Sequence, residues 1–201
     1  LNPWWVAFAQ ERAEAAAWTG YPTPQLRAVT DAILADLVLG PPAFDVGVDG
    51  RPVLNDRERA HMRDVRDVFA AFYGLALAGA AVLVAGTAIG RRDGRRAFRR
   101  RIRAGARGLA AGTVLVGGLG VLFFEPAFEL FHRLFFAEGS WTFDPRTERL
   151  VQLFPYRFWL ETTVALGVAL VAVGVLVGWA SGRGLRAPTG ELRTHIGETA
   201  A

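Results

Sequence analysis

Three long stretches without a charged side chain constrain the fold of this protein more than any other feature. Residues 68–89, 108–124 and 162–182 contain no Asp, Glu, Lys or Arg over 22, 17 and 21 residues. About 20 apolar residues in a helix cross the hydrocarbon core of a bilayer. A buried hairpin in a soluble protein is the alternative, but soluble helices of this length normally keep a polar stripe. The pattern therefore predicts an integral membrane protein with three visible spans.

Arginine is concentrated between the first two of these stretches. Nine of the 23 Lys and Arg residues fall within 91–107, and all nine are arginine. Short arginine-rich connections stay on the cytoplasmic side of a membrane. We therefore expect 91–107 and the C-terminus inside, and the other connections outside. Since topology accounts for the net charge of +4, we expect no nucleic-acid partner.

The predicted fold is a mainly α membrane protein, a transmembrane helical bundle with a small extracytoplasmic α/β cap. An N-terminus outside the cell needs a preceding segment to carry it across the membrane. We expect a further transmembrane helix or an uncleaved signal-like segment before Leu1, giving four spans in the full protein. The predicted parts are a cap at 1–64, spans at 65–90, 108–124 and 158–182, a cytoplasmic Arg-rich loop at 91–107, an extracytoplasmic aromatic-rich segment at 125–157 and a cytoplasmic tail at 183–201.

Two local signals outline the end of the cap. Asp49 and Gly50 accept the positive φ angles of a tight turn, so they predict a hairpin. Asn55 with Glu58 three residues later resembles a capping box, a pair that satisfies the free N–H groups at a helix start. From this point we expect one helix to run through His61 into the first span.

The second outside segment is unusually rich in aromatic residues. A belt of rings at the membrane boundary, packed against the cap, is one interpretation. An apolar pocket for an acyl chain or a lipid glyceryl group is the other, and the same rings can serve both. The candidate pocket residues are Phe131, Phe135, Phe136, Trp141, Phe154, Tyr156 and Trp159.

Two histidines lie at matching depth. His61 precedes the first uncharged stretch by seven residues and His132 follows the second by eight. At about 1.5 Å per helical residue, both lie roughly 10 Å beyond the apolar boundary on the same side. Imidazole titrates near neutrality, so a facing pair can accept one proton and deliver another. The third histidine, His195, lies in the polar tail and is expected to be solvated.

Four carboxylates are candidates to support the histidines. Asp64 follows His61 by three residues on the same helix face, where it can orient the ring or stabilise its charge. Glu125 and Glu161 lie near the outer ends of the second and third spans. The remaining candidate is Glu58.

Other catalytic chemistries are poorly represented. The chain has no cysteine, and Ser140 and Ser181, its two serines, lack a GxSxG elbow. Acyl transfer would therefore proceed without a covalent serine or cysteine intermediate. A metal site built on the two histidines and carboxylates is a competing hypothesis. The sequence contains no HExxH motif and no two histidines that are close together along the chain, so we expect neither a metal nor a cofactor.

Four short motifs occur together along the chain. They are ERAHMRDV from Glu58, FHRLFF from Phe131, GSWTF from Gly139 and LFP from Leu153. In this combination they resemble the lipoprotein intramolecular transacylase (Lit) family. The resemblance covers nearly the whole chain and implies four transmembrane helices, an extracellular cap and two catalytic histidines at the boundary between them. Those two histidines match His61 and His132.

The resemblance also implies a reaction and its partners. The enzyme would be a multi-pass protein of the bacterial cell membrane with its active site on the extracytoplasmic side, among membrane lipids. It would move the sn-2 acyl chain of a diacylated lipoprotein onto the α-amino group of the lipoprotein's own N-terminal cysteine, giving a lyso-form lipoprotein. Intramolecular attack closes an eight-membered ring, so confinement of the substrate would supply a large part of catalysis.

The roles of the two histidines stay open at this point. One would deprotonate the attacking ammonium, and the other would polarise the ester or protonate the departing glyceryl oxygen. A hypothesis of a different class also remains. In it, the protein is non-catalytic, and its histidines sense pH or hold the cap.

Overall fold

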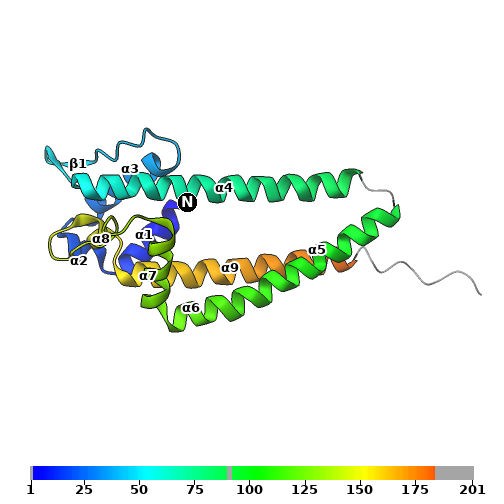
Figure 1. Ribbon diagram of the computed structural model, residues 1–201. Coiled ribbons are helices and arrows are strands. Elements are labelled where there is room, and N and C mark those ends of the chain that lie inside the picture. Colours follow the sequence, from blue (N-terminus) through cyan, green and yellow to red (C-terminus); the bar gives the residue numbers. More distant parts are fainter. Residues whose placement is uncertain (1, 90–91, 184–201) are drawn as a thin grey trace, which may run out of the picture.

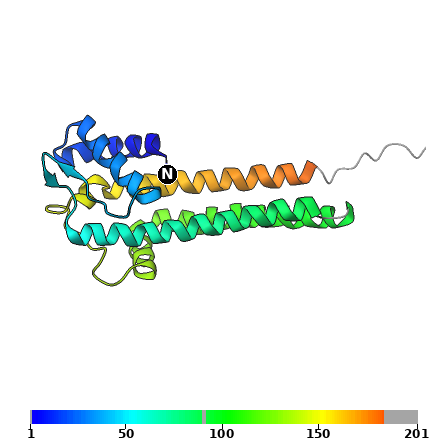
Figure 2. The ribbon, with the colours of Figure 1, turned by 90° about the horizontal axis from the view of Figure 1, so that it is seen from above.

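The computed structural model describes residues 2–89 and 92–183, which form a helical bundle with the short elements gathered at one end (Figure 1). We use the word cap for this end, which comprises residues 2–55 and 124–155. Three long helical paths run from the cap toward the Arg-rich end, and they stay roughly parallel when viewed from above (Figure 2). The elements are α1 (Pro3–Arg12), α2 (Ala15–Thr19), α3 (Thr23–Val38), β1 (Gly47–Val48), β2 (Arg51–Pro52), α4 (Asp56–Ile89), α5 (Arg92–Gly112), the π-helical turn η1 (Thr113–Gly117), α6 (Gly118–Leu122), α7 (Phe124–Phe135), α8 (Arg149–Leu153) and α9 (Tyr156–Arg183).

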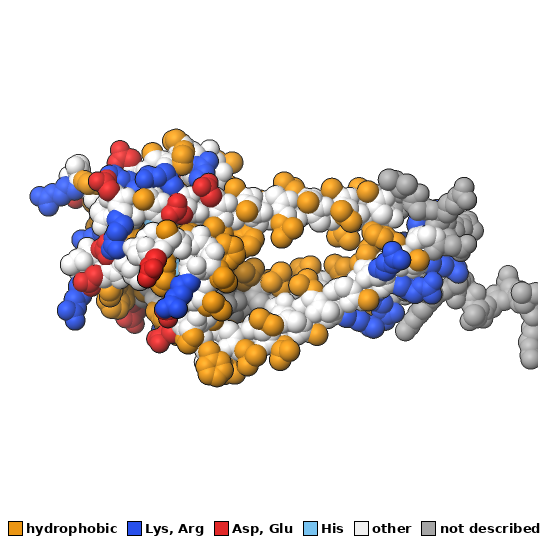
Figure 3. Space-filling view, in the orientation of Figure 1, with side chains coloured by type: hydrophobic (Ala, Val, Ile, Leu, Met, Phe, Trp, Pro, Cys, Tyr) orange, Lys and Arg blue, Asp and Glu red, His pale blue; other side chains and the backbone are white. Residues whose placement is uncertain are grey.

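Within residues 2–89 and 92–183, three helical paths are long and apolar enough to cross a membrane, in the regions predicted. They cover Asp56–Gly86, Gly94–Leu122 and Tyr156–Arg183. Their apolar side chains face outward, as at Leu75, which is 72% exposed, and Leu122, which is 77% exposed. Figure 3 shows these side chains along the helices, with charged groups at both ends. So large an apolar surface is typical of contact with lipid.

The Arg-rich segment 91–107 differs from the predicted loop, because it is helical from Arg92 onward and continues into the second span. Arginine has a high helix propensity, and the segment has no proline to interrupt it. The second path is therefore one helix with a π-helical turn inside it. At Phe123 the backbone leaves the helical region (φ −117, ψ 50), and α7 starts in a new direction (Figure 1).

Small residues allow α5 and α9 to pack closely. A Cβ atom on Gly174 would lie 2.9 Å from the Ala106 carbonyl oxygen and 3.1 Å from the Ala110 Cβ. Close approach at small residues is the usual way that helices associate in lipid. At the Arg-rich end, α4 meets this pair where the Phe98 ring of α5 lies against Gly86.

The cap has an apolar core, and the polar side chain of Gln10 is buried in it with its amide group hydrogen-bonded. Gln10 of α1 is 2% exposed. Its amide donates to Thr30 of α3 at 3.0 Å and to the Leu153 carbonyl of α8 at 2.9 Å. Three segments that are far apart in the sequence are joined at this point, which explains why the cap packs as one unit. The buried hydrophobic residues of this core include Val6, Ile33, Phe44, Leu54 and Leu153 of the cap, together with Met62 of α4 and Phe158 of α9.

The predicted hairpin is confirmed. Strands β1 and β2 pair antiparallel with Val48 opposite Arg51. The two turn residues Asp49 and Gly50 have φ of 52 and 73, as a two-residue hairpin turn requires.

The predicted capping box at the start of α4 is also confirmed. The Glu58 backbone N–H donates to the Asn55 side chain at 2.9 Å, and the Asn55 N–H donates to the Glu58 carboxylate at 2.7 Å. The other carboxylate oxygen of Glu58 accepts from the Leu150 N–H at 2.6 Å. Glu58 is 1% exposed, so a single buried carboxylate ties the first turn of α4 to α8.

Glu58→Gln should destabilise the fold. The amide nitrogen of glutamine cannot accept a hydrogen bond, so one of the two backbone N–H groups would lose its buried partner. We expect the free energy of unfolding to fall by about 1–3 kcal/mol, as measured by thermal or detergent-induced unfolding. Glu125→Gln is the matched control, because Glu125 is exposed, and its change should stay within about 0.5 kcal/mol. Equal stability of the two variants would contradict this account of Glu58.

Candidate functional site

The structure brings His61 of α4 and His132 of α7 together. Their ring centroids are 6.0 Å apart and their planes differ by 23°, so the two imidazoles are stacked and roughly parallel. Both are buried, with 6% and 8% of the residue exposed. The pair lies where α4 leaves the cap, at the end of the bundle opposite the Arg-rich segment.

Aromatic rings surround His132. The nearest is Phe128, one helical turn earlier, with centroids 4.1 Å apart. Trp141 follows at 5.0 Å, and Phe136 and Phe131 at 5.3 and 5.4 Å. This imidazole therefore lies in an apolar chamber from which much of the water is excluded.

His61 is enclosed by the same chamber. The Phe136 ring is 4.8 Å from it and the Phe143 ring 5.4 Å, each in an edge arrangement. The His61 Nδ1 atom is buried without a hydrogen-bond partner among the described residues. Among the described residues, this nitrogen is therefore free to form a hydrogen bond with a substrate.

The seven candidate pocket residues fall into two groups. Phe131, Phe136 and Trp141 contact a histidine directly, and Phe135 packs on Phe131 at 4.8 Å. The other group forms a neighbouring cluster, joined to the first through Phe128, whose ring is 6.2 Å from Trp159. Phe154 lies beside Trp159 in this cluster, and Tyr156 reaches Phe128 through the ring of Phe124.

Two rings at the site were absent from the candidate list. Phe128 could have been identified, since residues four apart on a helix share a face, and it lies four residues before His132. Phe143 lies in the irregular connection after α7, and no local pattern relates it to His61.

A backbone hydrogen bond determines which nitrogen of His132 carries the proton. His132 Nδ1 lies 2.8 Å from the Phe128 carbonyl oxygen. Because a carbonyl can only accept, Nδ1 is the protonated nitrogen, and the lone pair of the neutral ring is on Nε2. Burial lowers the pKa of His132 below its ordinary value of 6.5, although the Phe128 hydrogen bond acts in the opposite direction. His132 is thus a neutral imidazole at pH 7 with a basic nitrogen available.

Two of the four candidate carboxylates have other partners. Both oxygens of Glu58 accept backbone N–H groups, as described above. Glu161 of α9 accepts from Arg12 at 2.6 and 2.9 Å and from Arg157 at 2.9 Å. These contacts fasten α1 to the outer end of α9.

The other two candidate carboxylates, Asp64 and Glu125, are exposed. Within residues 2–89 and 92–183, neither forms a hydrogen bond or ion pair with His61 or His132. The three-residue spacing puts Asp64 and His61 on one face of α4, but aromatic rings, not the Asp64 carboxylate, surround the imidazole. The expected orienting carboxylate is therefore not seen in the described part of the chain, and His195 lies outside it.

The sequence analysis did not predict the polar clamp beside the chamber, which consists of Arg57 and Glu148. Arg57 of α4 donates to both carboxylate oxygens of Glu148, at 2.5 and 2.7 Å, and to the Thr142 carbonyl at 2.8 Å. Its guanidinium lies 4.7 Å from the Phe143 ring centroid. Burial alone raises the pKa of Glu148, but hydrogen bonds from Arg57, the Asp144 N–H and Asn55 outweigh burial and lower it. The clamp therefore holds an ionised pair next to the histidines.

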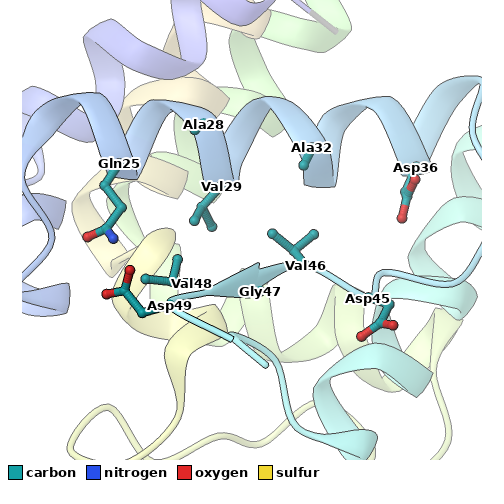
Figure 4. Close-up of a pocket in the computed structure, with 10 residues that line it drawn as sticks. All are labelled: Gln25, Ala28, Val29, Ala32, Asp36, Asp45, Val46, Gly47, Val48 and Asp49. Atoms are coloured by element: carbon teal, nitrogen blue, oxygen red, sulfur yellow. The ribbon is translucent and has the colours of Figure 1, made fainter. Parts of the chain in front are cut away.

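A separate cavity lies elsewhere in the cap. It has a volume of about 520 Å³ and lies between α3 and β1, where Val29 of α3 points toward the segment that carries Val46 and Val48, and Asp45 and Asp49 also line it (Figure 4). None of its ten lining residues belongs to the histidine chamber.

The fold and the site together define a multi-pass membrane protein with a buried, ring-enclosed histidine pair beside its cap. The chain belongs to the lipoprotein intramolecular transacylase Lit family, whose sequence profile matches residues 12–159. Both histidines and the clamp residues Arg57 and Glu148 lie within this range.

The proteins that are similar to this chain include one from Aquifex aeolicus and one from Bacillus cereus. An uncharacterised protein of Aquifex aeolicus (strain VF5) is 30% identical over 132 residues, which cover 64% of this chain and 56% of that protein. This chain thus matches little more than half the length of that curated relative. The in meso structure of the membrane integral lipoprotein intramolecular transacylase Lit from Bacillus cereus superposes with a TM-score of 0.65 at 18% identity. It covers 90% of this chain and 82% of that one, and at this identity it supports the fold alone.

The protonation of His132 can be measured directly. Isotope-labelled histidine in the detergent-solubilised protein, assigned with His132→Gln, should show an Nδ1-protonated neutral ring at pH 7. The titration midpoint should lie below 6.5, because burial penalises the charged ring more than the neutral one. A midpoint at or above 6.5, or a ring protonated on Nε2 alone, would contradict this geometry.

Proposed function

We propose that this protein is an intramolecular transacylase that forms lyso-form lipoproteins. It moves the sn-2 acyl chain of a diacylglyceryl lipoprotein to the α-amino group of the lipoprotein's N-terminal cysteine. Membership of the Lit family supports the class of reaction. The single observation that carries the proposal at the level of residues is the stacked imidazole pair, 6.0 Å apart, inside a chamber of aromatic rings.

The reaction requires two proton movements, and the imidazole pair is suited to both. The α-amino group has a pKa near 8, so it loses a first proton to reach the neutral, nucleophilic form. Its attack on the ester carbonyl carbon forms the C–N bond, and the C–O bond to the glyceryl group then breaks. A second proton leaves the nitrogen, and the glyceryl oxygen gains one. Ester and amine become amide and alcohol without any further reactant.

His132 is the better candidate for the base. Its Nδ1–H is held by the Phe128 carbonyl, which leaves the Nε2 lone pair directed away from that bond. His61, on the other side of the stack, would polarise the ester or protonate the departing oxygen. After the first proton has left for solvent, His132 would take the second proton from the nitrogen and His61 would give one to the glyceryl oxygen, so these two transfers balance. Exchange with solvent between turnovers would then restore both rings.

The aromatic chamber would favour transfer to nitrogen over transfer to water. Phe131, Phe135, Phe136 and Trp141 would hold the reacting glyceryl group and the start of the acyl chain. Phe154, Tyr156 and Trp159 would extend this wall. An apolar wall that excludes water suppresses hydrolysis of the ester to a free fatty acid. Confinement of amine and ester also reduces the entropic cost of closing the ring.

We place the active site at the extracytoplasmic surface of the bacterial membrane. The histidine pair, on the first turns of α4 and on α7, lies at the cap end of the bundle, and the arginines of α5 lie at the other end (Figure 1). Arginine-rich ends face the cytoplasm. The end with the histidines would therefore meet lipoproteins, whose lipid groups lie in the outer leaflet.

Mass spectrometry of a reporter lipoprotein tests the proposal. In bacteria that lack this modification, co-expression of the intact protein should move one acyl chain from the glyceryl group to the α-amine. His61→Ala and His132→Ala should each lower the initial rate by about 10²–10⁴-fold, the usual contribution of a positioned acid or base.

The third histidine provides a matched control for this experiment. His195→Ala should retain the activity of the unmodified protein. An unmoved acyl chain with the wild-type protein at normal expression would reject the transacylase function and favour the non-catalytic alternative. Full activity of either His61→Ala or His132→Ala would reject the histidine pair while leaving the reaction in place.

A further inference from the structure

The histidine chamber contains a second buried polar atom without a partner. Among the described residues, the indole Nε1–H of Trp141 makes no hydrogen bond, although it is buried. Buried polar groups in native proteins are nearly always hydrogen-bonded, so an unpartnered donor at a candidate site indicates a function. The Trp141 ring is 5.0 Å from His132, which in turn faces His61.

We infer that the Trp141 indole N–H is the hydrogen-bond donor to the ester carbonyl oxygen of the substrate in the transition state. This inference rests on the proposed transacylase function. When the amine nitrogen attacks the carbonyl carbon, the π electrons of the C=O bond move to the oxygen. The Trp141 N–H stabilises that negative charge without giving up its proton. The C=O bond then re-forms as the C–O bond to the glyceryl group breaks.

The chemistry of the indole suits this task. Its N–H is a donor and has no acceptor capacity, so it cannot exchange protons with the substrate. The two imidazoles are then free to carry the protons of the amine and of the glyceryl oxygen. In an apolar chamber a neutral donor aimed at a developing charge is worth more than the same donor in water.

The chain on both sides of Trp141 is held in place by Arg57. The Arg57 guanidinium donates to the Gly139 carbonyl at 3.4 Å and to the Thr142 carbonyl at 2.8 Å. It is paired with Glu148, which also accepts from the Asp144 N–H at 2.6 Å. These contacts fix the backbone just before and just after Trp141. A donor that is fixed before the reaction needs no reorganisation as charge develops, which is the basis of oxyanion stabilisation.

The exposure of the neighbouring rings indicates how the ester reaches the donor. Phe131 and Phe135 are 38% and 47% exposed, whereas Phe136 is 9% exposed. The first two therefore lie on the exposed side of the chamber, and we expect the ester to approach from that side. The ester supplies the acceptor that the Trp141 N–H lacks among the described residues. The hydrogen bond is thus gained with the substrate and strengthens as the oxyanion forms.

Replacement of a single atom group tests the inference. Trp141→Phe keeps an aromatic ring but removes the N–H. Replacement of Trp141 by benzothienylalanine keeps the bicyclic shape and exchanges N–H for sulfur. In the purified intact protein with a diacylglyceryl lipopeptide in detergent, both changes should lower kcat by about 10²–10³-fold, as expected for one oxyanion donor. KM should change by less than about threefold, because the donor acts mainly in the transition state.

Trp5→Phe is the matched control. Trp5 also has a single indole N–H, but it donates to Thr162 at 3.2 Å, away from the histidine chamber. The kcat of the Trp5→Phe variant should stay within about threefold of the wild-type value. Thermal unfolding of every variant verifies that the chain is folded, and the benzothienylalanine protein decides the outcome if Trp141→Phe is unstable.

The outcomes separate this inference from the proposed function. An active wild-type protein whose benzothienylalanine variant keeps kcat within about threefold overturns the role of Trp141 alone. A rise in KM with unchanged kcat also overturns it, since that result assigns Trp141 to ground-state binding. An inactive wild-type protein rejects the transacylase function itself, and the role of Trp141 with it.

Discussion

The geometry of the histidine chamber depends on how the first turn of α4 is tied to the chain between α7 and α9. The buried Glu58 carboxylate accepts a hydrogen bond from the Leu150 N–H. Arg57 pairs with Glu148 and donates a hydrogen bond to the Thr142 carbonyl. A helix is stiff over one turn, so these contacts at residues 57 and 58 also set the direction of His61. The same contacts position the segment that carries Trp141 and Phe143. One set of polar bonds, of which the bond from the Leu150 N–H to Glu58 is buried, therefore places both sides of the chamber.

The membrane imposes the second constraint. Three apolar helices leave little room for polar groups along their length, so charged residues gather at the two ends of the bundle (Figure 3). At the cap end, ion pairs such as Arg12 with Glu161 and Arg57 with Glu148 hold some of these groups. The histidines are enclosed by rings instead. A buried imidazole avoids the cost of desolvating a charge by remaining neutral, which is the form that accepts a proton.

Spacing along the chain predicts contacts within one helical turn, but not contacts between elements that are distant in sequence. The i, i+3 spacing correctly predicted the contact between Asn55 and Glu58, because both groups belong to one helical turn. The same spacing placed Asp64 near His61, yet Asp64 is exposed and the rings of Phe136 and Phe143 surround the imidazole. Helical spacing defines a face, but the element that packs on that face decides which residues make the contacts.

The amino-acid sequence by itself determined the properties that depend on neighbours along the chain. These are the three apolar spans, the arginine-rich end, the hairpin turn at Asp49, the cap of α4 and the common depth of the two histidines. Only the tertiary structure decided that Arg57 would meet Glu148, 91 residues away, and that the buried Trp141 N–H would have no partner within residues 2–89 and 92–183. Helical periodicity and span length are encoded within short segments, whereas these contacts depend on how α4, α7 and the connection between α7 and α8 pack against one another.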